Sequence, residues 1–130
     1  MSYNHLPEMI GRMEAELDRA VQETAEWGVG EMRLSMGQDK SGLLYGKHRA
    51  SAPGESPAID TGNLVNDLNS RKTGHMAAEI VTNVEYAGAL EWGRADGRMA
   101  PRPFFRPQAD PILEQLKRRA TDVLRRIYGG

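Results

Sequence analysis

The sequence predicts an α+β fold, with long N- and C-terminal helices packed on a small antiparallel sheet and a long central loop. Apolar residues recur at helical spacings near both ends of the chain, whereas strand-like alternation is confined to a short middle segment. A stretch rich in glycine, proline and serine lies between them and predicts the loop. At 130 residues the chain can bury one modest core, so we expect a single domain spanning residues 1–130.

The first predicted helix starts near residue 6 and runs towards residue 34. Its apolar positions are spaced by three and four residues, with charged residues between them. Asn4 is the expected N-cap, Pro7 suits the first turn and Gly37 is a natural stop. The apolar stripe consists of Leu6, Ile10, Met13, Leu17 and Val21.

Residues 38–59 are predicted to form the long loop, with one short strand at residues 43–45. A loop of this length in a small domain is uncommon and is usually functional. A short helix is expected at residues 63–68. Residues 71–83 then predict a hairpin, with residues 72–75 at its turn.

The last third of the chain is predicted to be helical at both of its ends. Residues 84–92 form a short helix that Gly93 ends, and residues 94–107 are irregular because three prolines interrupt them. A second amphipathic helix closes the chain. Its apolar face consists of Ile112, Leu116, Ala120, Val123 and Ile127.

The charge and composition of the chain disfavour several classes of protein. A formal net charge of −1 argues against tight, sequence-independent DNA binding, which needs a surplus of cations on one face. The chain has no cysteine, which excludes disulfides, thiolate metal sites and thiol nucleophiles. No segment resembles a membrane span or a signal peptide, so we expect a protein that acts where it is made or in something assembled there.

The stretch PAIDTGNL, residues 57–64, contains the Asp-Thr-Gly triplet of aspartic proteases. A homodimeric protease of that kind pairs one such aspartate from each subunit so that the two carboxylates share a proton. It also needs a β-rich frame, whereas the termini here predict helices. The plainer interpretation is that Asp60 or Thr61 caps the helix beginning near residue 63, while Gly62 adopts a backbone angle that other residues avoid.

No cofactor, metal or small-molecule site is expected from the remaining motifs. Residues 41–48, SGLLYGKH, have three residues between the glycines where a phosphate-binding loop needs four, and His48 follows the lysine. The three histidines, His5, His48 and His75, are scattered without the spacing of metal ligands.

Two clusters of basic residues have alternative interpretations. One lies in the last helix and the other recurs every fourth residue through the proline-rich segment. Each is either a solvated surface or a set of partners for acidic residues on a neighbouring subunit, such as those between Glu8 and Glu26. The clusters are Lys117, Arg118, Arg119, Arg125 and Arg126, and Arg94, Arg98, Arg102 and Arg106.

The most unusual stretch is PRPFFRP, residues 101–107. It holds both phenylalanines of the chain, Phe104 and Phe105, between prolines. Such a pair either folds back as a plug in the core or anchors the chain in a groove of another protein.

Taken in order, PxIDTGNL (57–64), VTNVEYAxxLEWG (81–93) and RPFFRP (102–107), followed by a last helix, resemble the gene-product-ten-like family of long-tailed bacteriophages. Members of that family are small structural neck proteins, described as head–tail joining or tail-completion proteins. The resemblance covers residues 53–109. Arg94 stands where the family often has threonine, and the insert at residues 95–100 and the segment 38–56 are poorly matched.

The resemblance implies a non-enzymatic α+β subunit of a homo-oligomeric ring, commonly six-fold. Its implied partners are the portal-adaptor or head-closure proteins and the tail-tube or terminator proteins, and genomic DNA passes nearby without tight binding. Its implied location is the virion neck or tail, after assembly in the host bacterial cytoplasm. The subunit or partner interface that we expect consists of Tyr86, Glu91, Trp92, Arg102, Pro103, Phe104, Phe105, Arg106 and Pro107. A host-encoded toxin or antitoxin is a further alternative at this chain length.

Overall fold

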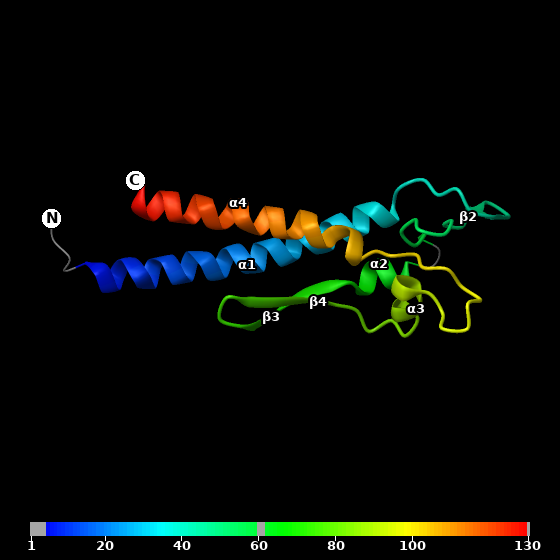
Figure 1. Ribbon diagram of the computed structural model, residues 1–130, viewed down its shortest axis with the longest axis horizontal. Coiled ribbons are helices and arrows are strands. Elements are labelled where there is room, and N and C mark those ends of the chain that lie inside the picture. The colour runs from blue at the N-terminus through cyan, green and yellow to red at the C-terminus, as the bar shows by residue number, and fades with distance from the viewer. Residues whose placement is uncertain (1–4, 60–61, 130) are drawn as a thin grey trace.

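The computed structural model describes residues 5–59 and 62–129, which form an elongated molecule of mixed helix and sheet (Figure 1). The predicted α+β class is confirmed. In chain order the elements are α1 (Leu6–Met36), β1 (Leu44–Tyr45), β2 (His48–Arg49), α2 (Asn63–Asp67), β3 (Asn69–Gly74), β4 (Ala77–Val81), α3 (Ala87–Trp92), the 3₁₀ turn η1 (Arg106–Gln108) and α4 (Ala109–Tyr128).

Helix α1 confirms the first predicted helix and extends it to Met36. Pro7 lies in its first turn, and the N–H of Gly37 donates to the carbonyl oxygens of Arg33 and Leu34 at its end. The predicted N-cap, Asn4, lies outside the described residues. Most buried side chains of α1 come from its second half, so the core lies towards that end of the helix.

Helix α4 confirms the predicted C-terminal helix and runs antiparallel beside α1 (Figure 1). Near the end of α4, the Tyr128 hydroxyl donates to the sulfur of Met13, at 3.6 Å. At its start, Ile112 lies against Gly28, where the missing side chain lets the two helices approach closely.

The hairpin β3–β4 packs on the other side of α1, and its turn differs from the prediction. The pairing of Gly74 with Ala77 places the turn at His75 and Met76 rather than at residues 72–75, and β3 begins at Asn69 rather than at residue 71. A tertiary contact accounts for the shift, because the Asp18 carboxylate of α1 accepts hydrogen bonds from the Met76 N–H, at 2.8 Å, and from Lys72 Nζ, at 2.9 Å.

A second small hairpin lies inside the predicted central loop, at the far end of the molecule (Figure 1). Strand β1 lies within the predicted strand at residues 43–45, but its partner β2 was missed. The pairs Leu44–Arg49 and Tyr45–His48 leave a two-residue turn, which is the tightest hairpin connection and carries little sequence signal in a segment this short.

The core is centred on the second half of α1. The fully buried side chains of Met32, Leu68 and Phe104 meet there, from three separate segments of the chain. Arg33 of α1 donates to the carbonyl oxygens of Val65, at 3.0 Å, and Leu68, at 2.5 Å, which holds α2 in place. The core cluster consists of Val29, Met32, Met36, Leu64, Leu68, Ala87 and Phe104.

Candidate interaction interface

Helix α3 positions the residues of the motif EYAGALEWG on two sides. Ala87 and Glu91 are buried, whereas Tyr86 and Leu90 line a pocket beside the core. Gly93 ends the helix with φ at +78°, and a Cβ there would lie 2.8 Å from the carbonyl oxygen of Met99. The glycine of this motif is therefore required by the sharp reversal that brings residues 99–107 back onto α3.

The buried carboxylate of Glu91 holds the backbone of the Pro-Phe-Phe-Arg segment. Only 4% of Glu91 is exposed, and Oε1 accepts hydrogen bonds from the N–H groups of Phe104, at 3.0 Å, and Phe105, at 2.7 Å. Oε2 accepts from the N–H of Arg106, at 3.3 Å, and from its Nε, at 2.8 Å. The Arg106 Nη2 completes the clamp by donating to the Glu91 carbonyl oxygen, at 2.6 Å.

These donors keep Glu91 ionised. Burial alone raises the pKa of the Glu91 carboxyl, but the hydrogen bonds from the Arg106 side chain and from the backbone of Phe105, Phe104 and Arg106 together outweigh it. The net result is a pKa below the ordinary range of a glutamate. The two motifs EWG and RPFFRP are thus joined by one buried charge.

The same clamp presents an aromatic surface to solvent. The guanidinium carbon of Arg106 lies 4.3 Å from the centroid of the Trp92 ring, and Trp92 is 67% exposed. The stacked Arg106 cation is attracted to the face of the Trp92 ring and so favours this orientation of the two side chains. With the exposed Pro107 next to Arg106, these residues form what we call the Trp92 patch, defined as Trp92, Arg106 and Pro107.

Two residues of the expected interface are buried within the chain. Phe104 is 1% exposed and belongs to the core, so the core-plug interpretation holds for it and the groove-anchor interpretation does not. Glu91 is likewise buried. Phe104 and Glu91 are buried together because the Pro-Phe-Phe-Arg segment folds back onto α3. The Glu91 carboxylate accepts hydrogen bonds from backbone N–H groups of that segment that burial would otherwise leave unpaired.

The other residues of that set have intermediate or exposed positions. Phe105 is half-buried with its ring centroid 4.6 Å from that of Phe104. Arg102 and Pro103 are half-buried, and the Arg102 side chain donates to the carbonyl oxygens of Ser51, at 3.2 Å, and Ala100, at 2.8 Å. Arg102 therefore fastens the loop to its own chain, while Tyr86, at 48% exposed, lies outside the Trp92 patch at the pocket.

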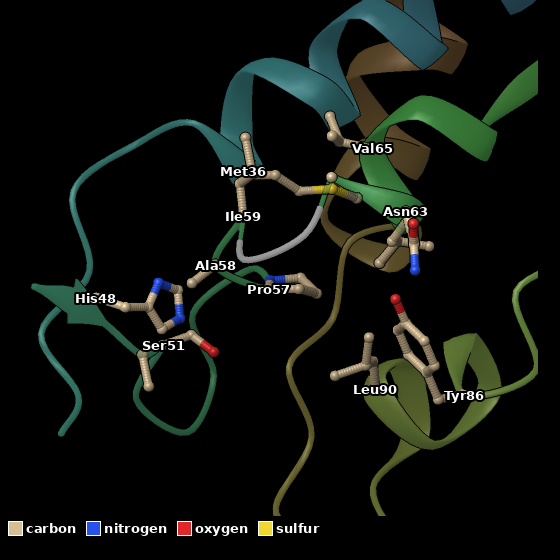
Figure 2. Close-up of a pocket in the computed structure, with 13 residues that line it drawn as sticks. Met36, His48, Ser51, Pro57, Ala58, Ile59, Asn63, Val65, Tyr86 and Leu90 are labelled. Carbon is tan, nitrogen blue, oxygen red and sulfur yellow. The ribbon is translucent and has the colours of Figure 1, made fainter. Parts of the chain in front are cut away.

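That pocket has a volume of about 440 Å³ and lies beside the segment that contains the Asp-Thr-Gly triplet. Figure 2 shows Tyr86 and Leu90 of α3 on one side of it, and His48 and Ser51 on the other. In the part of the chain that the structure describes, the Ser51 hydroxyl makes no hydrogen bond with the His48 ring. The pocket therefore combines an apolar lining with a few separate polar groups.

The triplet itself is only partly described. Asp60 and Thr61, the expected helix cap, lie outside the described residues. Gly62 immediately precedes α2 with φ at +85°, which is the left-handed angle that glycine adopts readily.

The basic residues of α4 are partly accounted for within the chain. Arg119 pairs with Glu23, at 2.7 Å, and Arg126 lies 3.8 Å from Glu16, so these two cations face acidic residues of their own α1. The antiparallel packing of α4 on α1 brings them together. Three further cations of α4 have no ion pair among residues 5–59 and 62–129, namely Lys117, Arg118 and Arg125.

Sequence reasoning missed an exposed apolar tip on the β1–β2 hairpin. Leu43 is 71% exposed, Leu44 55% and Tyr45 62%. The sequence did contain a signal for this exposed tip, namely three consecutive large apolar residues between Gly42 and Gly46. Such a short apolar run inside a glycine-rich loop cannot readily pack into the core and indicates an exposed apolar surface.

Among the described residues, no group of three or more His, Asp or Glu side chains is arranged to hold a metal ion. No helix in the described ranges has both the length and the apolar character needed to cross a membrane. No protein-family model, curated protein or solved structure matches this chain.

Proposed function

We propose that this chain is a non-enzymatic structural protein of the bacteriophage neck. It forms an oligomeric ring at the head–tail junction or tail end, where it completes the tail or joins it to the capsid connector. The proposal comes from the order of the three sequence motifs, and one structural observation carries it further. All three motif segments contribute to a single cluster around the second half of α1.

The cluster joins them directly. Leu64 from the first motif, Ala87 from the second and Phe104 from the third belong to one buried core, and Glu91 binds the third motif to the second. Segments that are separated along the chain but share one core form a structural unit. This shared core gives a physical reason why the three motifs occur together in one sequence. The Trp92 patch lies on the surface of this unit.

The surface of the chain also suits an assembly subunit. Large apolar side chains are exposed at widely separated places, including Leu6 and Ile10 at one end and Leu43 to Tyr45 at the other. Monomeric proteins rarely leave contiguous apolar patches uncovered, whereas subunits bury them on association. The near-neutral charge is compatible with a ring through which DNA passes without being held.

The aspartic-protease alternative has less support. It requires a β-rich frame, but the described residues form long helices and two two-stranded sheets. The residues after the triplet form α2. If the purified wild-type protein cleaved peptides at mildly acid pH and the Asp60→Asn variant did not, that activity would replace the structural proposal.

The test of the proposal is binding to purified phage heads and tails, separately, followed by native mass spectrometry of the protein with portal-adaptor and tail-tube proteins. We expect rings, or monomers that form rings on one of these partners. Trp92→Ala should lose binding while a matched variant, Leu34→Ala, keeps it, because Leu34 is similarly exposed, at 61%, but lies outside the Trp92 patch. A protein that stays monomeric and decorates neither particle would refute the proposal.

A further inference from the structure

The β1–β2 hairpin ends in apolar side chains that its own chain leaves uncovered. The three residues Leu43, Leu44 and Tyr45, which we call the hairpin tip, are consecutive and all exposed. They lie at one end of the elongated molecule, away from the α1–α4 pair (Figure 1). Contiguous exposed apolar surface on a protein marks a place where another protein or a membrane binds.

Both faces of the hairpin carry an exposed apolar side chain. Directly opposed residues of an antiparallel pair lie on the same face, so Leu44 shares one face with Arg49 and Tyr45 shares the other with His48. A two-stranded hairpin without packing is only marginally stable in water. A cover that reaches both faces at once would therefore stabilise this element.

The base of the hairpin is fastened to the rest of the chain, in contrast to its tip. The Glu55 carboxylate accepts hydrogen bonds from the N–H groups of Ser41, at 3.1 Å, and Ala52, at 2.6 Å, which draws the two ends of the hairpin segment together. The Arg102 side chain donates to the Ser51 carbonyl oxygen, at 3.2 Å. The exposed tip therefore projects from a fixed base.

The charge beside the hairpin tip is positive. No carboxylate occurs in the chain between Asp39 and Glu55. Lys47, in the hairpin turn, is exposed and has no ion pair among residues 5–59 and 62–129. Arg49 is exposed as well, and its Nη1 donates to the Gly42 carbonyl oxygen, at 3.0 Å, which keeps the guanidinium on the hairpin. The tip is thus an apolar surface with cations beside it.

We propose that the hairpin tip inserts into the interface of an anionic lipid membrane. Leu43 and Leu44 enter the boundary of the acyl chains, and the Tyr45 ring lies at the level of the headgroups, where tyrosine is favoured. Lys47 and Arg49 bind the lipid phosphates. A lipid interface surrounds a projecting element and so covers both of its faces.

A protein partner suits this element less well. A stable protein interface takes about 20–30 residues on each side, whereas the hairpin from Gly42 to Ala50 offers nine. A flat protein surface would also cover only one of its faces. A lipid interface imposes no complementary shape, and binding to it depends on the inserted apolar area and on the attraction between cations and anionic headgroups.

The proposal is independent of the neck function. The assembly proposed above does not need the hairpin tip, because Leu6, Ile10 and the Trp92 patch remain exposed for contacts between subunits. The lipid contact is therefore tested on the full chain by itself.

The first experiment measures co-sedimentation with vesicles of equal parts phosphatidylglycerol and phosphatidylcholine, and with vesicles of phosphatidylcholine alone. We expect binding to the anionic vesicles to be about tenfold tighter or more, and to weaken as salt is added, because salt screens the headgroup charges. A Leu44→Ser, Tyr45→Ser double variant should bind the anionic vesicles about tenfold more weakly. Its circular dichroism should stay unchanged, since both side chains are exposed.

The control is a Leu124→Ser, Tyr128→Ser double variant. It removes the same two residue types at the opposite end of the molecule, where they are also exposed and lie close in sequence to the cations Arg125 and Arg126. This variant should bind the anionic vesicles as the wild type does. It therefore distinguishes the hairpin tip from exposed apolar and basic surface in general.

The second experiment tests insertion directly. The chain has no cysteine, so Leu43→Cys can be labelled at that one position with a nitrobenzoxadiazole fluorophore. With the anionic vesicles we expect its emission to shift to shorter wavelength and to be quenched by lipids that carry a nitroxide on the acyl chain. The same label at Leu124→Cys should show neither change.

The outcomes decide between lipid and protein. A wild type that does not bind anionic vesicles, or a tip variant that binds them as well as the control variant does, would overturn the proposal. Binding without a shift of the Leu43 probe would overturn it too, because it would show adsorption through charge alone. If the tip variant instead lost binding to phage heads, tails or further copies of the chain, and vesicles were not bound, the tip would be a protein contact.

Discussion

At the scale of single residues, Glu91 joins two separate segments of the chain. Its carboxylate accepts from three consecutive backbone N–H groups and from Arg106, in a position that is almost fully buried. Hydrogen bonds to a charged group are the stronger kind, and leaving such donors unpaired in a buried site is costly. The exposed Trp92 patch therefore depends on an internal anion.

We expect Glu91→Gln to lower the free energy of unfolding at pH 7 by about 1.5–3 kcal/mol. Since its folded-state pKa lies below the ordinary value, the ionised Glu91 contributes stability that is fully present above about pH 4.5 and is lost as the pH falls through the lowered pKa. The difference between wild type and variant should therefore shrink towards pH 3 in urea denaturation measured across that range. A difference that is constant from pH 7 to pH 3 would show that the charge is not what matters.

Phe104 and Trp92 form a matched pair for separating core from surface. Phe104→Ala removes a fully buried ring and should cost about 3–5 kcal/mol, enough to reduce soluble expression. Trp92→Ala removes a ring that is mostly exposed and should change stability by less than about 1 kcal/mol. Thermal unfolding of both variants at one protein concentration tests this, and equal losses would contradict the assigned positions.

At the scale of elements, α1 carries its glycines for different reasons. At Gly28 an added Cβ would lie 2.7 Å from Ile112 Cδ1 and 3.0 Å from Ile80 Cδ1, so this glycine permits close packing of α4 and the hairpin. At Gly30 nothing lies within 4 Å of such an atom. Gly28 therefore serves packing, whereas Gly30 only weakens the helix.

Gly30→Ala should therefore stabilise the protein by about 0.5–1 kcal/mol, since it raises helix propensity without a clash. Gly28→Leu should destabilise it by about 1–3 kcal/mol, because the larger side chain must displace Ile112 and Ile80. Chemical denaturation at fixed protein concentration measures both. Equal effects of the two substitutions would mean that α4 and the hairpin do not pack over Gly28.

At the scale of the whole molecule, the two halves differ in how they are covered. The half around Phe104 has a core built from several elements, whereas at the start of α1 Leu6 and Ile10 are 45% and 40% exposed.

Hydrogen exchange should show this difference. Amides of residues 9–17 should exchange faster than those of residues 29–36, because the buried side chains of α1 begin only at Ala20. Amides of residues 29–36 should be the better protected, since the core covers them. Equal exchange over the two ranges would contradict this difference.

The sequence by itself determined the elements whose signals are local. Helical spacing identified α1 and α4, and Gly37 and Gly93 marked the ends of α1 and α3. Periodicity could not place the turn of the β3–β4 hairpin, because a tertiary contact with Asp18 fixes that turn. It could not find β2 either, because this strand is only two residues long.

The tertiary structure alone decided the candidate site. Whether the phenylalanine pair lies inside or outside depends on Glu91, which is 13 residues before Phe104 and had no local pattern to link it to that backbone. The same holds for the apolar stripe of α1, because the spacing of apolar residues indicates that a helix face is covered but does not identify the segment that covers it. Local spacing fixes which faces need burial, and only long-range packing determines which of them the chain covers itself.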